Sequence, residues 1–324
     1  MRLLKLVPDN TNIRFLRYRV PFYAVSLLLM AASIALVMTK GLNLGVDFIG
    51  GQMVRVTFAQ SASAPIADLR EDVAALGYGE PVIQQLGAPN QVAVRMKLPE
   101  QGSELGTAAQ MTQRIVATIR AEHPDARIDG VEAVSGKVSE ELFSTGMLAL
   151  ALAMLGISIY IWVRFEWQFG VGALFALLHD VTLTLGLFAL TGWEFDLNIV
   201  AALLTLIGYS LNDNIVVYDR IRENLKKFRK MPLSELLDLS VNETLSRTVV
   251  TSGSLLITLL ALLILGPDVI FGFTAAITFG IFVGTYSSIF MSTPILIWLG
   301  VKSDSFLPTE TPAERQERIA RGEA

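Results

Sequence analysis

The class of fold is decided by the stretch Leu197-Asn-Ile-Val-Ala-Ala-Leu-Leu-Thr-Leu-Ile-Gly-Tyr-Ser-Leu-Asn-Asp-Asn-Ile-Val-Val217. It has the length of about 20 mostly apolar residues that a helix needs to cross a bilayer, so it predicts a membrane-spanning helix. Asp213 places a carboxyl group within this apolar run. Such a carboxylate is costly unless it is paired, hydrated or protonated, so by default it marks an ion or proton path. Its polar neighbours in the sequence are Tyr209, Ser210, Asn212 and Asn214.

The composition of the whole chain is typical of a membrane protein. Of its 324 residues, 52% are hydrophobic and 17% are charged, and the mean hydropathy is +0.51. Soluble domains are usually about 45–50% apolar and about 25% charged. The net charge of −4 argues against a nucleic-acid partner. The chain has no cysteine, which excludes a disulfide, a thiolate metal site and a cysteine nucleophile, and its two histidines leave little scope for a histidine-rich metal site. We also expect no metal, no cofactor, no catalytic residue and no enzymatic activity.

Six apolar stretches predict six membrane helices, at Pro21–Met38, Thr145–Val163, Phe169–Leu190, Leu197–Val217, Val249–Leu265 and Phe271–Leu299. The last stretch is longer than a bilayer requires, which predicts tilt or an extension into the interface. The first stretch is expected to remain as an uncleaved helix. Its basic flank is too long for a signal peptide, and no clean cleavage site follows it.

Basic residues predict the orientation, because segments rich in Lys and Arg stay on the cytoplasmic side of a membrane. Residues 1–20, 218–248 and 301–324 are rich in them, whereas the loops at 191–196 and 266–268 contain neither Lys nor Arg. We therefore expect both termini in the cytoplasm and residues 39–141 on the outside.

The segment at residues 39–141 has the periodicity of a small α+β domain. Alternating residues predict strands at Met53–Phe58, Val82–Leu86, Val92–Lys97 and Arg127–Val134. Helical spacing of apolar residues predicts helices at Pro65–Leu76 and Thr107–Glu122. The resulting order, βαββαβ, is that of a ferredoxin-like unit.

The remaining parts of the chain complete the predicted organisation. In the segment 218–248, a series of leucines at helical spacing predicts a helix that lies along the inner membrane face, within a cytoplasmic loop. The predicted division is a cytoplasmic segment at 1–20, the first helix at 21–38, the external domain at 39–141, a five-helix membrane domain at 142–300 and a polar cytoplasmic tail at 301–324.

Four motifs occur in order along the chain: Gly45-Val-Asp-Phe-Ile-Gly-Gly51, Leu177-Leu-His-Asp-Val181, the run from Gly208 to Asn224, and Asn242-Glu-Thr-Leu-Ser-Arg-Thr248. On six helices and one external domain, they resemble the SecD/SecF family of the bacterial Sec translocon, in its standalone proteobacterial SecF form. The resemblance covers the chain except for the polar tail. It also implies the fold of the resistance-nodulation-division superfamily.

This resemblance implies a protein of the bacterial inner membrane with residues 39–141 in the periplasm. Its function would be to use the proton-motive force to help draw preprotein across the membrane. The implied partners are SecD in a heterodimer, the SecYEG channel, YajC, the translocating preprotein and membrane lipid. The family also associates the positions of Asp213 and Arg247 with proton transport.

Asp213 and Arg247 are therefore the candidate proton-coupling residues. Burial raises the pKa of a carboxyl group and a nearby cation lowers it, so a carboxyl group between the two can bind and release a proton. Thr251, Ser254 and Thr258 follow Arg247 on one helical face, which favours a hydrated groove. The alternatives are a static interhelical hydrogen bond for Asp213 and an arginine that snorkels to the interface for Arg247.

Other polar residues and glycines have two interpretations each. His179, Asp180, Tyr209 and Asn212 form either a proton relay or a structural hydrogen-bonded anchor. A domain hinge, favoured over direct substrate contact, is predicted at Gly45, Asp47, Gly50 and Gly51. Close helix packing, which also suits an interface with SecD, is predicted at Gly280 and Gly284.

Three other functions compete with protein translocation. A half-size, proton-driven exporter of the resistance-nodulation-division type would need a partner, because such exporters carry two six-helix halves. An intramembrane aspartyl protease would use Asp180 and Asp213. Its Gly-x-Gly-Asp signature is missing, because Ser-Leu-Asn precedes Asp213. A purely structural scaffold would leave Asp213 without a role.

Overall fold

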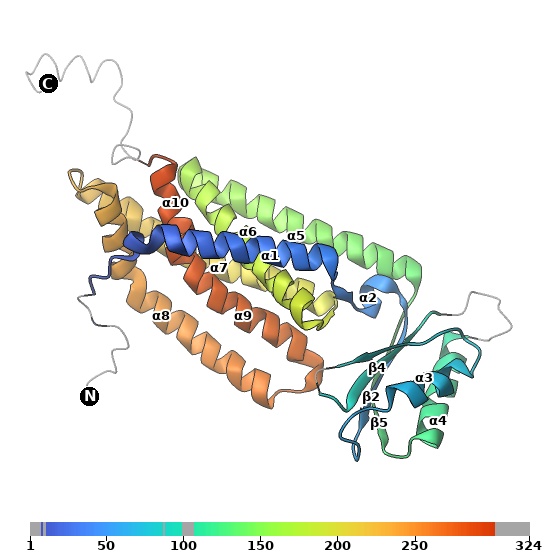
Figure 1. Ribbon diagram of the computed structural model, residues 1–324. Coiled ribbons are helices and arrows are strands. Elements are labelled where there is room, and N and C mark those ends of the chain that lie inside the picture. The colour runs from blue at the N-terminus through green and yellow to red at the C-terminus, as the bar shows by residue number, and fades with distance from the viewer. Residues whose placement is uncertain (1–7, 9–10, 87, 99–106, 302–324) are drawn as a thin grey trace, which may run out of the picture.

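The computed structural model describes residues 8, 11–86, 88–98 and 107–301. These residues form a bundle of long helices with a small α/β domain at one end (Figure 1). Within them, six helices are long and apolar enough to cross a membrane. The predicted polar tail beyond residue 301 lies outside the described residues, as do residues 1–7, 9 and 10 of the predicted N-terminal segment.

The six long helices divide into a central and a peripheral set. Their elements are η1 and α1 (Phe15–Tyr18, Arg19–Thr39), α5 (Gly136–Arg164), α6 (Trp167–Thr191), α7 (Leu197–Lys227), α8 (Leu233–Leu265), and α9, η3 and α10 (Phe271–Ser287, Ser288–Ser292, Thr293–Trp298). About half or more of the apolar window is buried in α6, α7 and the helix that begins with α9, against 17% in α1, α5 and α8. Polar side chains on the three central helices can therefore face protein rather than lipid.

The connection between α7 and α8 is shorter than predicted. Residues 218–248 are expected to contain a loop and a separate surface helix, but α7 continues to Lys227 and α8 begins at Leu233. No Gly or Pro occurs between residues 233 and 252, so nothing interrupts the helix. The expectation of a helix along the membrane face is wrong, because its apolar face belongs to a buried cluster with α7 that contains Leu236, Leu237, Val241, Ile221 and Leu225.

Two more helices differ from their predicted extents. α5 begins at Gly136 rather than at Thr145, because Ser135 caps it and accepts a hydrogen bond of 3.4 Å from the Val138 N–H. The last span is not one regular helix, since α9 passes into a π-helical turn, η3, before α10. In that turn the Ser288 carbonyl accepts hydrogen bonds from the hydroxyls of Ser292 and Thr293, at 2.7 and 2.9 Å.

The α/β domain confirms the predicted βαββαβ order. Its elements are β2 (Gly51–Phe58), α3 (Ile66–Ala74), β3 (Val82–Gln85), β4 (Gln91–Met96), α4 (Ala108–Glu122) and β5 (Ala126–Val134). The antiparallel sheet has the order β3-β4-β2-β5, which is the arrangement of a ferredoxin-like unit. Alternate residues of β2 and β4 pack with α3 and α4 into one core that includes Val54, Val56, Val92, Val94, Leu69 and Ile115.

The opposite face of this sheet is directed to the membrane bundle. Two short elements follow α1: strand β1 (Asn43–Leu44) and helix α2 (Val46–Ile49). β1 pairs in parallel with β6 (Glu194–Phe195), which lies just before α7. Val46 of α2 is buried with Met53 and Ala93 of the sheet. The domain is thus attached to the bundle in two ways. The chain itself connects them through α2 and α5, and the β1–β6 pair adds a non-covalent contact.

Gly280 allows α9 to lie directly against α7. A Cβ atom added at this position would lie 2.5 Å from Cδ2 of Leu206, which is itself buried. Gly186 has the same role between α6 and α1, because an added Cβ would lie 3.0 Å from the Cα atom of Ser33. Small residues at helix contacts let membrane helices approach closely and gain van der Waals packing.

We expect the Gly280→Ala substitution to destabilise the helix bundle by about 1–3 kcal/mol, the usual cost of overpacking a filled core. Thermal unfolding in detergent micelles would measure the effect as a lower melting temperature. The matched control is Gly253→Ala on α8, where an added Cβ meets nothing within 4 Å. Equal melting temperatures for the two variants would contradict the prediction.

Candidate functional site

Asp213 lies at a junction of three helical segments in the membrane bundle. Its carboxylate is buried, with 8% of the residue exposed. Thr248 of α8 donates a hydrogen bond of 2.8 Å to Oδ1, and Ser288 of η3 donates one of 2.6 Å to Oδ2. Each carboxylate oxygen therefore has one neutral hydroxyl donor, and the two donors come from different helical segments.

Arg247 does not pair with Asp213 in this structure. Arg247 is exposed on α8, and among the described residues no ion pair joins it to Asp213, although its positive charge acts on that carboxylate from a longer distance. The following residue, Thr248, makes the contact instead, because consecutive residues of an α-helix point about 100° apart. The polar series Thr251, Ser254 and Thr258 shares the exposed face with Arg247. Hydroxyl groups, and not the expected arginine, therefore make the direct contacts with the Asp213 carboxylate.

Asp180 forms a second buried carboxylate at the centre of the bundle. It is fully buried on α6, and Ser210 of α7 and Ser287 of α9 donate hydrogen bonds of 2.7 and 2.9 Å to its Oδ2 atom. Its Oδ1 atom lies 3.0 Å from Nδ1 of the neighbouring His179, which is also fully buried. In the described part of the chain, Asp180 and Asp213 are the acidic side chains classed as buried.

The other two predicted polar residues, Tyr209 and Asn212, have different surroundings from each other. Tyr209 donates a hydrogen bond of 3.0 Å to the Ser252 hydroxyl of α8, which also accepts one of 2.8 Å from Thr285 of α9. This hydroxyl cluster lies between the same three helices as the Asp213 site. Asn212, in contrast, is exposed and directed away from the buried carboxylates.

Thr248, Ser287 and Ser288 contact the carboxylates but are not among the predicted site residues. Their hydroxyl groups give a weak signal in a sequence, because Ser and Thr also occur in membrane helices bound to their own backbone. Thr278 on α9 has this ordinary arrangement, since its hydroxyl donates to the Thr274 carbonyl at 2.7 Å. The adjacent pair Ser287-Ser288 in an apolar stretch is the one local hint.

The predicted hinge residues form the junction between the domain and the bundle. Oδ2 of Asp47 accepts a hydrogen bond of 3.0 Å from the backbone N–H of Leu197, the first residue of α7. A Cβ at Gly45 would lie 3.0 Å from Oε1 of Glu194. Gly51 has a φ of +118°, and a Cβ there would lie 2.6 Å from the Met96 carbonyl oxygen. These residues therefore permit close backbone contacts at the junction.

A buried ion pair holds the same junction together. Arg95 of β4 lies 2.8 Å from Glu194 of β6 and donates a hydrogen bond of 2.8 Å to the Leu44 carbonyl of β1. The side chains of Arg95 and Glu194 are 11% and 12% exposed. Burial raises the pKa of the Glu194 carboxyl above its ordinary value, and the positive charge of Arg95 opposes that shift. One arginine thus connects the sheet to both short strands of the membrane domain.

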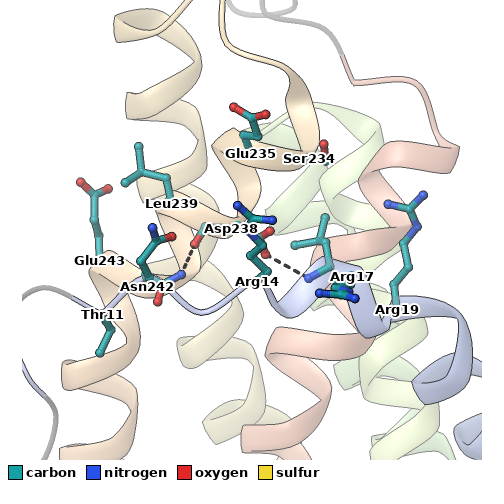
Figure 2. A pocket seen from close by; sticks show the side chains of 12 residues that line it. Thr11, Arg14, Arg17, Arg19, Ser234, Glu235, Asp238, Leu239, Asn242 and Glu243 are labelled. Atoms are coloured by element: carbon teal, nitrogen blue, oxygen red, sulfur yellow. Dashed lines mark hydrogen bonds between the residues drawn. The ribbon is translucent and has the colours of Figure 1, made fainter.

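The motif that begins at Asn242 holds the start of the first membrane helix. The Asn242 side chain exchanges two hydrogen bonds with the backbone of Ile13, at 2.9 and 2.8 Å. The carboxylate of Asp238 accepts the Leu16 N–H at 3.0 Å (Figure 2). A cavity of about 860 Å³ lies alongside, and its charged lining residues are Arg14, Arg17, Arg19, Glu235, Asp238 and Glu243. The motif therefore has a structural role in attaching the N-terminal segment to α8.

The carboxyl groups of Asp180 and Asp213 belong to a chemical class that can bind and release a proton. Within the described residues, no group of three or more His, Cys, Asp or Glu side chains is arranged to hold a metal ion. A carboxylate that is ionised accepts hydrogen bonds, whereas a protonated one donates a hydrogen bond as well. Hydroxyl groups suit both states because each can donate or accept.

Comparison with known proteins identifies the class to which this arrangement belongs. Residues 115–302 match the family model for the C-terminal part of the protein-export membrane proteins SecD and SecF, and residues 35–62 match the SecD/SecF GG motif. The chain therefore belongs to the SecD/SecF family of protein-export membrane proteins. The GG-motif match contains Gly45, Asp47, Gly50 and Gly51, the residues of the domain junction.

Within this family, the individual proteins similar to the chain include SecF subunits. The chain is 43% identical to the protein translocase subunit SecF of Cereibacter sphaeroides over 92% of its length and 93% of that protein. It is 37% identical to SecF of Vibrio alginolyticus over 97% of its length and 98% of that protein. The predicted resemblance to SecF is thereby confirmed.

A solved structure shares the fold. The crystal structure of SecDF from Thermus thermophilus, a translocon-associated membrane protein, superposes with a TM-score of 0.81 at 35% identity. The superposition covers 90% of this chain but 39% of that longer chain. A second SecDF crystal structure, in a super-membrane-facing form, gives a TM-score of 0.63. The predicted fold class, a polytopic helical membrane protein with a ferredoxin-like domain, is confirmed.

Removing Arg95 should destabilise the junction, because it would leave Glu194 buried without its cation. We expect Arg95→Ala to cost about 3 kcal/mol, the lower end of the range for breaking a buried pair. The matched control is Arg127→Ala, which removes an exposed arginine paired with Asp129 and should cost less than about 1 kcal/mol. Thermal unfolding and limited proteolysis between β5 and α5 would compare the variants. A control that unfolds as early as Arg95→Ala would refute the assignment.

Proposed function

We propose that this chain acts as a SecF-type accessory subunit of the Sec translocase and that Asp213 couples proton movement to preprotein translocation across the inner membrane. The observation that carries the proposal is the environment of Asp213. Its buried carboxylate is held by hydroxyl groups of α8 and η3 rather than by a cation. A purely structural carboxylate at this depth would be expected to have a fixed cationic partner.

Neutral donors let Asp213 exist in two protonation states. When the carboxyl group is ionised, it accepts hydrogen bonds from Thr248 and Ser288. When it is protonated, it can donate to one of the same oxygens, and no buried cation is left unpaired. The change therefore rearranges hydrogen bonds to two other helical segments. Moving one charge across the membrane is worth about 2.3 kcal/mol per 100 mV, enough to bias a conformational equilibrium of a few kcal/mol.

The proposed orientation places both termini in the cytoplasm and the α/β domain in the periplasm. The start of α1, the connection from α7 to α8, and α10 lie at the end of the bundle opposite the domain (Figure 1). Within the described residues, the basic segments 11–20 and 218–248 belong to that opposite end, which supports a cytoplasmic location for it. The domain would then contact the preprotein as it emerges from the SecYEG channel.

SecD is the proposed partner in the membrane, with YajC as a further component of the assembly. The SecDF structure that the chain resembles is much longer, and this chain covers 39% of it. In this proposal, SecD corresponds to the remainder of that structure. An exposed arginine on a membrane helix is costly against lipid. The hydroxyls of Thr251, Ser254 and Thr258 on the same face donate to backbone carbonyls of their own helix. The face of α8 that carries Arg247, Thr251, Ser254 and Thr258 is thus the proposed SecD-facing surface.

Cross-linking can test this surface directly, because the chain contains no native cysteine. We expect Ser254→Cys, labelled with a photoactivatable thiol reagent in membranes, to cross-link to SecD. The control is Leu155→Cys on the exposed face of α5, which should attach to lipid or to nothing. A cross-link to SecD from position 155 and none from position 254 would contradict the proposal, because it would place the SecD interface on α5 instead of α8.

The proton-coupling role predicts a selective defect in Asp213→Asn. In inverted membrane vesicles, a proton gradient should stimulate preprotein translocation by the wild type and leave the variant at its gradient-free rate. Asn keeps the size of the side chain but cannot change its charge. The matched control is Asp219→Asn on the same helix, where the carboxylate is half exposed and paired with Arg164. Gradient-dependent stimulation of Asp213→Asn at the wild-type level would exclude the role and leave a scaffold function.

A further inference from the structure

The two buried carboxylates are connected through adjacent residues of one turn. Ser287, the last residue of α9, donates to Asp180, and Ser288, the first residue of η3, donates to Asp213. Both serines are fully buried. A single peptide unit therefore joins a hydroxyl bound to the carboxylate on α6 to a hydroxyl bound to the carboxylate on α7.

Each of these serines has a choice of two acceptors. The Ser288 hydroxyl lies 2.6 Å from Oδ2 of Asp213 and 3.0 Å from the Thr285 carbonyl oxygen. The Ser287 hydroxyl lies 2.9 Å from Oδ2 of Asp180 and 3.2 Å from the Gly284 carbonyl oxygen. A hydroxyl group has one hydrogen to donate, so each serine can serve the carboxylate or its own helix.

Protonation of a carboxylate changes that choice without breaking a covalent bond in the serine. When Oδ2 of Asp213 gains a proton, it becomes a donor to the Ser288 oxygen. The hydrogen of Ser288 is then free to turn to the Thr285 carbonyl, 3.0 Å away. Ser287 can respond to Asp180 in the same way. Each change alters the hydrogen bonding at the point where α9 becomes π-helical.

The local backbone is suited to such a change. Within the π-helical turn, the Ser288 carbonyl accepts two side-chain hydroxyls, from Ser292 and Thr293. π-helical turns occur mostly as isolated interruptions of α-helices, often at functional sites. Gly284 keeps space beside the carboxylate, because an added Cβ would lie 3.4 Å from Oδ2 of Asp180.

The other groups around the two carboxylates are compatible with proton binding at both. His179 faces Asp180 from the same helix, with its Nδ1 atom 3.0 Å from Oδ1 of Asp180, and its Nε2 atom is buried without a hydrogen-bond partner among the described residues. From the remaining helices, Ser210 faces Asp180 and the Tyr286 ring lies 6.1 Å from that of His179. Near Asp213, the charged group on α8 is the exposed Arg247.

We propose that Asp180 is a second proton-binding carboxyl of the coupling site and that Ser287 and Ser288 make its protonation dependent on that of Asp213. The inference rests on the proposed function of Asp213. It assigns to the His179-Asp180 motif a role in proton binding, and it assigns to the π-helical turn the role of connecting the two carboxyl groups.

Infrared difference spectroscopy tests the proposal without relying on translocation. The full chain is reconstituted with SecD in vesicles of phosphatidylethanolamine and phosphatidylglycerol, and the carbonyl band of protonated carboxyl groups is followed against pH. We expect Asp180→Asn and Asp213→Asn each to remove part of the band. Ser287→Ala should move the midpoint of the Asp213 titration, and Ser288→Ala that of the Asp180 titration, each by about one pH unit, which is a tenfold change in proton affinity. The control is Thr278→Ala on α9, whose hydroxyl donates only to its own helix.

The outcomes separate this inference from the proposed function. If Asp180→Asn removes no part of the band and Ser287→Ala leaves the Asp213 titration unchanged, Asp180 is a structural anchor and the inference is wrong. If Asp213→Asn changes neither the band nor gradient-dependent translocation, the proposed function itself fails. Should Asp180→Asn not assemble in the membrane, Ser287→Ala gives the same decision, because it removes a single oxygen atom.

Discussion

The structure of the membrane bundle depends on satisfying two buried carboxylates, those of Asp180 and Asp213. Asp213 has no ion-pair partner among the described residues, so its direct contacts are hydrogen bonds. An unsatisfied polar group in such surroundings costs several kcal/mol, so each carboxylate oxygen has to find a donor on another helix or on its neighbour. Asp180 draws donors from α7 and α9, and Asp213 draws them from α8 and η3. The helices must therefore approach to within hydrogen-bonding distance. Gly280 on α9 provides space for that approach, because an added Cβ would lie 2.5 Å from Leu206 of α7.

One helix connects this centre to the α/β domain. α7 carries Asp213, and its first residue, Leu197, is held by Asp47 at the junction. The strand just before α7 carries Glu194, which is paired with Arg95 of the sheet. A change in the position of α7 would therefore act on the domain through short, buried contacts rather than through a flexible linker. This continuity supports the proposed coupling between proton binding at Asp213 and the position of the α/β domain.

Features that depend on local sequence pattern agree with the structure. The six spans follow from the length of apolar runs, and the βαββαβ order follows from alternation and helical spacing within short segments. Departures arise where neighbouring elements decide the outcome. The leucines of residues 233–245 are amphipathic in sequence, and that pattern alone cannot distinguish a membrane surface from a facing helix. In the structure the partner is α7, so the segment becomes part of one long α8.

By itself, the sequence determined that the chain has repeated spans long enough to cross a membrane, that an α+β domain follows the first of them, and that Asp213 is an unusual carboxylate in an apolar helix. These properties depend on composition and on spacing along one element. Only the tertiary structure decided which groups surround that carboxylate. Arg247 and Thr248 are adjacent in sequence, but helical geometry turns the arginine outward and the threonine inward. The link from Asp213 through Ser288 and Ser287 to Asp180 arises because three separate helices pack at one point, a relation that spacing along the chain does not encode.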